Sequence, residues 1–128
     1  MAGEKILVID DEEIIYAVFQ KELEKEGYTI DYALDGETGI KLAKNKKYDL
    51  IYIDYNMPGG MNGVQTCKEV KKVSPESVAI FMTGTLITGL IVREMAFQNA
   101  GGKIYWLYKP FNQDELIEVT RKALAERQ

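Results

Sequence analysis

A short apolar run that ends in an aspartate, at residues 50–54, most constrains how this chain can fold. The run Leu-Ile-Tyr-Ile has no polar position, which is typical of a strand covered on both faces and therefore of a parallel sheet packed between helices. Asp54 follows where the chain leaves the sheet, and Pro58 with nearby glycines lets the backbone turn before the next helix. The carboxyl end of a parallel strand is where open α/β sheets bind ligands.

Similar apolar runs recur along the chain and alternate with amphipathic segments. Further strands are predicted at residues 5–10, 28–33, 77–83 and 103–108. A helix is predicted after each strand, the fourth over residues 86–100 and the last capped by Asn112 and Glu115. Five such alternations predict an α/β domain with a five-stranded parallel sheet and helices on both faces. We expect one domain over residues 1–128, with all strand ends at one edge.

Composition limits the compartment and the partners of the chain. The formal net charge is −4 and no run of Lys or Arg is present, which predicts no direct nucleic acid binding. Cys67 is the only cysteine and is expected to be a small buried residue in a protein of a reducing compartment. The start of the chain has no signal-peptide pattern, and no stretch reaches the ~20 apolar residues of a bilayer span. We therefore expect a cytoplasmic protein with no membrane partner.

Polar side chains stand at four of the five predicted strand ends: Asp10 and Asp11, Asp54, Thr83, and Lys109. Each has an ordinary structural explanation alone, since acids cap helices and a Lys before Pro is often solvated. Two unit charges about 4 Å apart interact by roughly 4 kcal/mol at an effective dielectric near 20, so clustered carboxylates need a cation. Without histidine or a thiolate cluster, carboxylate oxygens favour Mg²⁺. Asp54 could then attack phosphorus, with Lys109 and Thr83 neutralising phosphoryl oxygens.

Four motifs together resemble the signature of the response-regulator receiver domain of two-component signalling, and the match covers essentially the whole chain. They are Asp10-Asp11, Asp54-x-x-Met57-Pro58, Thr83-Gly84 and Lys109-Pro110-Phe111. The resemblance implies a doubly wound (βα)5 flavodoxin-like fold of the chemotaxis-regulator type. It also implies phosphorylation on aspartate by a partner sensor histidine kinase or histidine phosphotransfer protein, followed by contact with a downstream protein target.

The same resemblance implies roles for the acidic residues. Asp54 would be the phosphoacceptor and a ligand of the metal. Asp11 would bind Mg²⁺ directly, and Asp10 would act mainly through a bound water. The backbone carbonyl of Asn56 would complete the protein's share of the coordination.

A second group of residues is implied to bind the phosphoryl group and to switch. Thr83 and Lys109 would contact the phosphoryl oxygens, and Gly84 would leave space for them. Thr83 would move towards the phosphoryl group while an aromatic residue, here Trp106 in place of the usual tyrosine or phenylalanine, turns inward. The signal would be displayed by the helix over residues 86–100, the last strand and the last helix.

Several features depart from the family's usual pattern or could tune it. The loop over residues 57–63 and the interval between Thr83 and Lys109 are both longer than usual, and the predicted helix over residues 86–100 is too apolar for one buried stripe. Part of that helix is expected to meet a partner. Asn56 and Thr85 flank the expected entry of the attacking water and could set the lifetime of the phosphorylated state.

Other functions are kept as alternatives. The chain could be a pseudo-receiver that binds partners without phosphorylation, which the intact set of acids, Thr83 and Lys109 disfavours. A metal-dependent phosphatase of the haloacid-dehalogenase type is disfavoured because Asp10 and Asp11 are adjacent, and a flavin carrier because acids would repel its phosphate. We therefore expect a signalling domain that catalyses only its own phosphorylation and dephosphorylation. Whether it acts alone or as part of a longer protein stays open.

Overall fold

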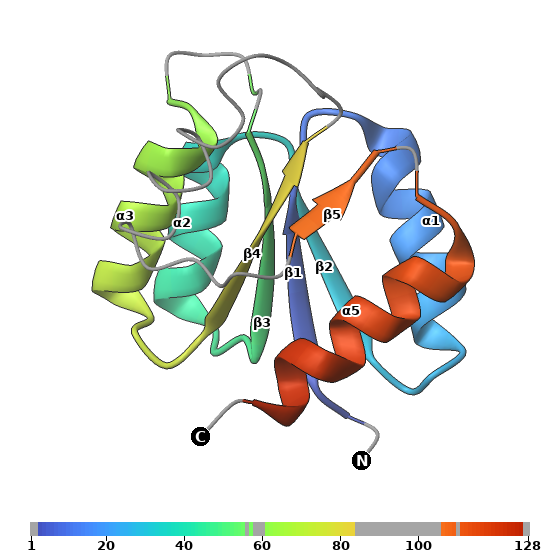
Figure 1. Cartoon of the computed structure of the whole chain (residues 1–128). Helices are drawn as coiled ribbons and strands as arrows, with labels where there is room; N and C mark the ends of the chain where they lie inside the picture. Colours follow the sequence, from blue (N-terminus) through green and yellow to red (C-terminus); the bar gives the residue numbers. More distant parts are fainter. Residues whose placement is uncertain (1–2, 56, 58–60, 84–105, 110, 127–128) are drawn as a thin grey trace.

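A parallel five-stranded sheet forms the centre of the molecule (Figure 1). The computed structural model describes residues 3–55, 57, 61–83, 106–109 and 111–126. The strands are β1 (Lys5–Ile9), β2 (Thr29–Ala33), β3 (Leu50–Asp54), β4 (Val78–Thr83) and β5 (Trp106–Tyr108). Their order across the sheet is β2-β1-β3-β4-β5, and every neighbouring pair is parallel.

Helices cover both faces of this sheet. They are α1 (Glu13–Glu24), α2 (Gly36–Asn45), α3 (Gly63–Val73) and α5 (Gln113–Ala125). In Figure 1, α1 and α5 lie on one side of the strands and α2 and α3 on the other. The predicted α/β class with a parallel sheet between helices is therefore confirmed, while the helix expected over residues 86–100 lies outside the described residues.

The two faces of the sheet are packed by alternate residues of the same strands. In β1, Ile6 and Val8 join the cluster that includes α1 and α5 residues, whereas Leu7 and Ile9 join the cluster with α2 and α3 residues. All four side chains are fully buried. Strand β3 is buried in the same way. Successive side chains of a strand point to opposite faces of the sheet, so a strand covered by helices on both sides must be apolar on both faces. Cys67, on α3, is buried as expected.

Side-chain caps fix where three of the helices begin. Asn112 accepts from the backbone N–H of Glu115 at 2.8 Å while Glu115 accepts from that of Asn112 at 3.0 Å, which confirms the predicted capping box of α5. Asn62 and Gln65 form a second box at α3 that the sequence reasoning did not foresee. Asp35 caps α2 through the N–H of Thr38 at 2.8 Å. These caps satisfy backbone N–H groups that helices otherwise leave unpaired.

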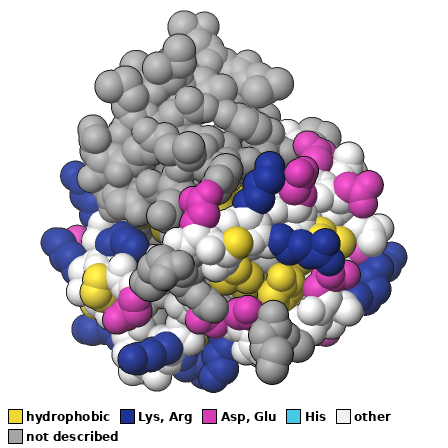
Figure 2. Space-filling view, turned by 60° about the horizontal axis from the view of Figure 1, so that its bottom comes forward, with side chains coloured by type: hydrophobic (Ala, Val, Ile, Leu, Met, Phe, Trp, Pro, Cys, Tyr) yellow, Lys and Arg dark blue, Asp and Glu magenta, His cyan; other side chains and the backbone are white. Residues whose placement is uncertain are grey.

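The described surface carries charges of both signs and few large apolar side chains. Figure 2 shows Lys, Arg, Asp and Glu interspersed over the face that includes the lower end of the molecule in Figure 1. Among the described residues, the exposed large hydrophobic side chains are Ile14 and Leu34. None of the described helices combines the length and apolar character needed to cross a bilayer.

The sheet order determines where a ligand site can form. Strand β1 pairs with β2 on one side and with β3 on the other. The order in which the chain adds strands to the sheet therefore reverses at β1. Such a switch point leaves a crevice at the carboxyl ends of the two central strands, because the connections that follow them leave towards opposite faces. Asp10 directly follows β1 and Asp54 ends β3, so both stand at this crevice.

Candidate functional site

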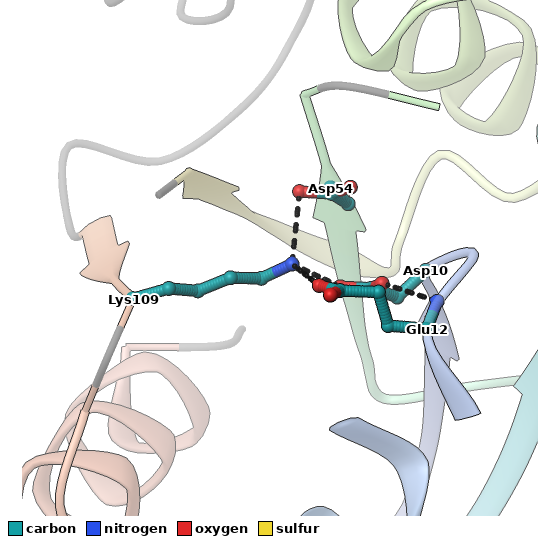
Figure 3. A network of polar contacts seen from close by, with 4 residues as sticks. All are labelled: Asp10, Glu12, Asp54 and Lys109. Carbon is teal, nitrogen blue, oxygen red and sulfur yellow. Dashed lines mark hydrogen bonds and ion pairs between the residues drawn. The ribbon is translucent and has the colours of Figure 1, made fainter. Parts of the chain in front are cut away.

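One ammonium group joins acidic side chains from separate parts of the chain (Figure 3). Lys109 Nζ lies 2.7 Å from Asp10 Oδ2, 3.3 Å from Asp54 Oδ1 and 3.0 Å from Glu12 Oε1. Asp10 follows β1, Asp54 ends β3 and Lys109 follows β5. The structure thus brings together three residues that the sequence reasoning placed at separate strand ends.

The two aspartates of this cluster are held in place by the backbone around them. Asp10 is fully buried, and its Oδ1 accepts a hydrogen bond of 2.9 Å from the N–H of Glu12. Asp54 is 3 % exposed, and the N–H of the following Tyr55 donates to the carbonyl of Met82 on β4 at 2.9 Å. Burial in fixed backbone surroundings preorganises both carboxylates before any ligand arrives.

Gly63 lets the start of α3 approach the carboxyl end of β3. Its N–H donates to the carbonyl of Tyr55 at 3.1 Å. A Cβ atom at this position would lie 2.7 Å from the backbone oxygen of Asp54 and 2.8 Å from Cα of Tyr55. Both contacts are closer than van der Waals packing allows, so only glycine fits without moving the backbone that carries Asp54.

Burial and mutual charge shift the proton affinities of the three groups. Burial raises the pKa of Asp54 to about 7, with a further contribution from the charge of Asp10, and the ammonium of Lys109 opposes this rise. Burial also raises the pKa of Asp10, and its contact with the Lys109 ammonium partly offsets this rise. Burial alone would lower the pKa of Lys109, but the contacts with Asp10 and Asp54 raise it above its usual value. Lys109 is therefore an ammonium at neutral pH, beside carboxylates that compete for it.

Thr83 stands at the same edge of the sheet. It ends β4 with 1 % of its surface exposed, and its carbonyl accepts a hydrogen bond of 2.9 Å from the N–H of Lys109. The backbone of Trp106 begins β5 opposite Phe81, and its side chain lies outside the described set. The predicted site residues Asn56, Gly84 and Thr85 also lie outside the described residues.

Glu12 belongs to the cluster, although the sequence reasoning gave it no role. Its carboxylate lies within hydrogen-bonding distance of Lys109 although the two residues are 97 positions apart. The available signal was its place in the acidic run over residues 10–13. Acids at the start of a helix are common, so nothing in the sequence separated Glu12 from Glu13.

The acidic residues present fit a divalent metal ion. One carboxylate oxygen from each of Asp10, Asp11 and Glu12 lies within 4.8 Å of the other two. With Asp54, this group of described side chains has four carboxylates and one ammonium, that of Lys109, so it has an excess of negative charge if all are ionised. An all-oxygen donor set with excess negative charge is what Mg²⁺ and Ca²⁺ prefer. Asp54 is linked to the trio through Lys109.

A hollow of about 470 Å³ opens beside this acidic trio. It lies between the loops after β1, β2 and β3 and is lined by Asp11, Glu13, Leu34, Asp35, Gly36, Glu37 and Met61. Asp11 is exposed, whereas Asp10 and Asp54 are buried. Of these three aspartates, Asp11 is therefore the one that is open to solvent.

Similar sequences are found among bacterial regulators. The chain is 28% identical over 124 residues to the response regulator ArlR of Staphylococcus saprophyticus, covering 94% of this chain and 52% of that protein. It is 30% identical over 127 residues to the transcriptional regulatory protein TcrA of Mycobacterium tuberculosis, covering 99% of this chain and 48% of that protein. The chain spans about half the length of these relatives.

Solved structures share the whole fold. A CheY-like response regulator receiver domain protein from Methanospirillum hungatei superimposes with a TM-score of 0.89 at 26% identity, covering 98% of this chain and 97% of that one. The chemotaxis protein CheY4 of Vibrio cholerae gives a TM-score of 0.85 at 26% identity, covering 95% and 99% of the two chains.

These relatives correct the prediction that the partners exclude nucleic acid. TcrA is named as a transcriptional regulatory protein, and so is PhoP of Bacillus subtilis. PhoP is 42% identical over 70 residues, covering 55% of this chain and 29% of that protein. The prediction was wrong because it used the net charge of these 128 residues to judge the partners of the protein. The charge of one domain carries no information about a region outside it.

Residues 6–121 match the family of the response regulator receiver domain. This match includes Asp10, Asp54, Thr83 and Lys109, which stand at the carboxyl ends of β1, β3, β4 and β5. The family resemblance drawn from the four sequence motifs is confirmed. The chain belongs to the response regulator receiver domain family of two-component signalling.

Proposed function

We propose that residues 1–128 form a single receiver domain in which Asp54 accepts a phosphoryl group from a phosphohistidine of a partner kinase or phosphotransfer protein. The observation that carries the proposal is the Lys109 ammonium held 3.3 Å from Asp54 and 2.7 Å from Asp10 at the crevice of the sheet. A cation fixed beside a buried carboxylate is suited to neutralise phosphoryl oxygens as they approach. We infer a cytoplasmic location, since a chain with a single cysteine has no internal disulfide to form.

The proposed transfer is a direct displacement at phosphorus. An oxygen of the Asp54 carboxylate attacks, the P–O bond forms, the P–N bond to the histidine breaks, and its electron pair stays on the imidazole nitrogen. Asp54 must be ionised to attack. Burial works against this by raising its pKa to about 7, and the ammonium of Lys109 works in favour of it.

Mg²⁺ would be held by the acidic residues at the open side of the crevice. We assign Asp11, Asp10 and Asp54 to it, together with the backbone carbonyl of Asn56, and the position of Glu12 adds a further carboxylate nearby. When bound, the ion would neutralise charge on the carboxylates and on phosphoryl oxygens. The protein's own part is to hold these oxygens in place through buried backbone contacts.

The proposed output is a change at β4, β5 and α5 with the segment over residues 86–100. Thr83 and Trp106 are the switch residues in this proposal. Support comes from the bond between the Lys109 N–H and the Thr83 carbonyl, which ties the two phosphoryl-binding residues together across β4 and β5. Gly84, with Asn56 and Thr85, is assigned to shaping and tuning the phosphorylated state.

Binding of beryllofluoride, a mimic of the phosphoryl group, tests the proposal. Isothermal titration should show binding that requires Mg²⁺ and that Asp54→Asn abolishes. Asp114→Asn is the matched control, because it makes the same Asp-to-Asn change at an acid in the first turn of α5, after the site residues in the sequence. This variant should bind beryllofluoride like the unaltered protein. Binding of equal strength to the Asp54→Asn protein, or none to the unaltered one, would refute phosphoryl acceptance at Asp54 and favour a module that works without phosphorylation.

A further inference from the structure

Glu12 makes an unusual contact for a residue at the start of a helix. It occupies the N-cap position of α1, yet its side chain makes no capping hydrogen bond. The carboxylate instead lies 3.0 Å from Lys109 Nζ, with 55% of the side chain exposed, compared with 15% for Lys109. Its side chain is therefore not needed to begin the helix.

The Lys109 ammonium is already shared among three carboxylates. An ammonium group carries three N–H donors, and three carboxylates, those of Asp10, Glu12 and Asp54, lie within 3.3 Å of its nitrogen. A phosphoryl oxygen bound to Asp54 would add an acceptor. One of the present partners would then have to share or give up the ammonium.

The exposure of the carboxylates indicates which one. Asp10 and Asp54 have 0% and 5% of their side chains exposed, so losing the ammonium would leave a buried charge without compensation. The 55% exposed carboxylate of Glu12 can exchange the ammonium for water at little cost. Glu12 is the partner that leaves most easily.

We propose that Glu12 is a positioning residue that holds the Lys109 ammonium in the resting protein and competes for it with the phosphoryl group on Asp54. The inference rests on the proposed function and deepens it. Glu12 would then set how tightly the phosphorylated state is held. Removing its charge should strengthen binding of a phosphoryl mimic by about two- to fivefold, the range expected for a partly exposed ion pair.

The test compares Glu12→Gln with Glu13→Gln, because both remove one negative charge from neighbouring positions and no ion pair joins Glu13 to Lys109 among the described contacts. Beryllofluoride affinity is measured by titration calorimetry at saturating Mg²⁺, and Mg²⁺ affinity is measured separately. Glu12→Gln should bind beryllofluoride more tightly than Glu13→Gln. In the resting protein, the Lys109 ammonium resonance in nitrogen-15 NMR should shift with Glu12→Gln and not with Glu13→Gln.

Two outcomes would overturn the inference. Equal beryllofluoride affinity in the two variants would mean that Glu12 acts only as a general negative charge. Weaker beryllofluoride binding by Glu12→Gln would mean that its carboxylate supports the site rather than competing with the ligand. Failure of the proposed function is a separate result, because the unaltered protein would then bind no beryllofluoride at all.

Discussion

Lys109 and Gly63 show how single residues determine the geometry around Asp54. Lys109 supplies a cation to carboxylates that would otherwise repel one another, and Gly63 supplies room for α3 beside the backbone of β3. The first effect is electrostatic and the second is steric. Both act at the carboxyl end of the same strand.

Gly63→Ala should destabilise the protein by about 1–3 kcal/mol, because the new Cβ would lie too close to the backbone of Asp54. In an ordinary helical position the same change stabilises by about 0.5–1 kcal/mol, so the sign is informative. Urea unfolding followed by circular dichroism measures the change. A variant as stable as the unaltered protein would show that the contact is relieved without cost.

At the scale of elements, each strand was predictable from its own residues. A run that is apolar on both faces identifies a central strand without knowledge of its neighbours, and β3 was placed at its observed bounds. The capping box of α5 was also recognisable in the sequence, since Asn112 and Glu115 precede a clear apolar pattern. That of α3 was missed because Asn62 follows a loop rich in glycine, where the same residue types are common for other reasons.

Long-range polar contacts at the other end of the sheet could not be predicted. Tyr48, just before β3, donates a hydrogen bond of 2.6 Å to Asp31 Oδ2 on β2, and Lys46 Nζ lies 3.2 Å from the same oxygen. Partial burial would raise the pKa of Asp31, but these two contacts lower it overall. The pairing depends on how the strands are ordered, which local sequence does not contain.

The Asp31 contact should make stability depend on pH. Because the pKa of Asp31 is lower in the folded than in the unfolded protein, its contribution is complete above the unfolded value near 3.8 and is lost as the pH falls through the folded value. Tyr48→Phe should cost about 1–2 kcal/mol at neutral pH and less in acid. Unfolding in urea at several pH values measures this, and a cost that is unchanged in acid would contradict it.

For the whole molecule, the acidic crevice should be a weak point of the metal-free fold. The folded protein holds the Asp54 proton up to a pKa of about 7, whereas the unfolded chain releases it near 3.8. Between these values the unfolded state binds fewer protons, so this group lowers stability as the pH rises. The crevice that is suited to a ligand is thus expected to oppose folding.

Asp54→Asn should therefore stabilise the metal-free protein at about pH 8, with the gain shrinking as the pH falls towards about 4. Added Mg²⁺ should raise the melting temperature of the unaltered protein more than that of the variant. Thermal unfolding with and without a chelator measures both effects. A variant that is less stable than the unaltered protein at every pH would contradict the charge crowding on which the site argument rests.

The residues of the site were more predictable from the sequence than the partners of the protein. Asp10, Asp54 and Lys109 were predictable together because a parallel sheet places its strand ends at one edge. The exclusion of nucleic acid failed because it extended the net charge of this domain to a protein whose relatives are about twice as long. Glu12 was missed because it lies in a run of four acids over residues 10–13, where nothing in the sequence distinguishes it from Glu13.

Covalent phosphorylation followed by mass spectrometry tests the central claim most directly. The protein is incubated with Mg²⁺ and phosphoramidate, a small phosphodonor that needs no partner protein. We predict a mass increase of one phosphoryl group, located by peptide mapping on Asp54, that a chelator or Asp54→Asn abolishes. A mass that stays unchanged, or a phosphoryl group found on another residue while Asp54 is intact, would contradict the account.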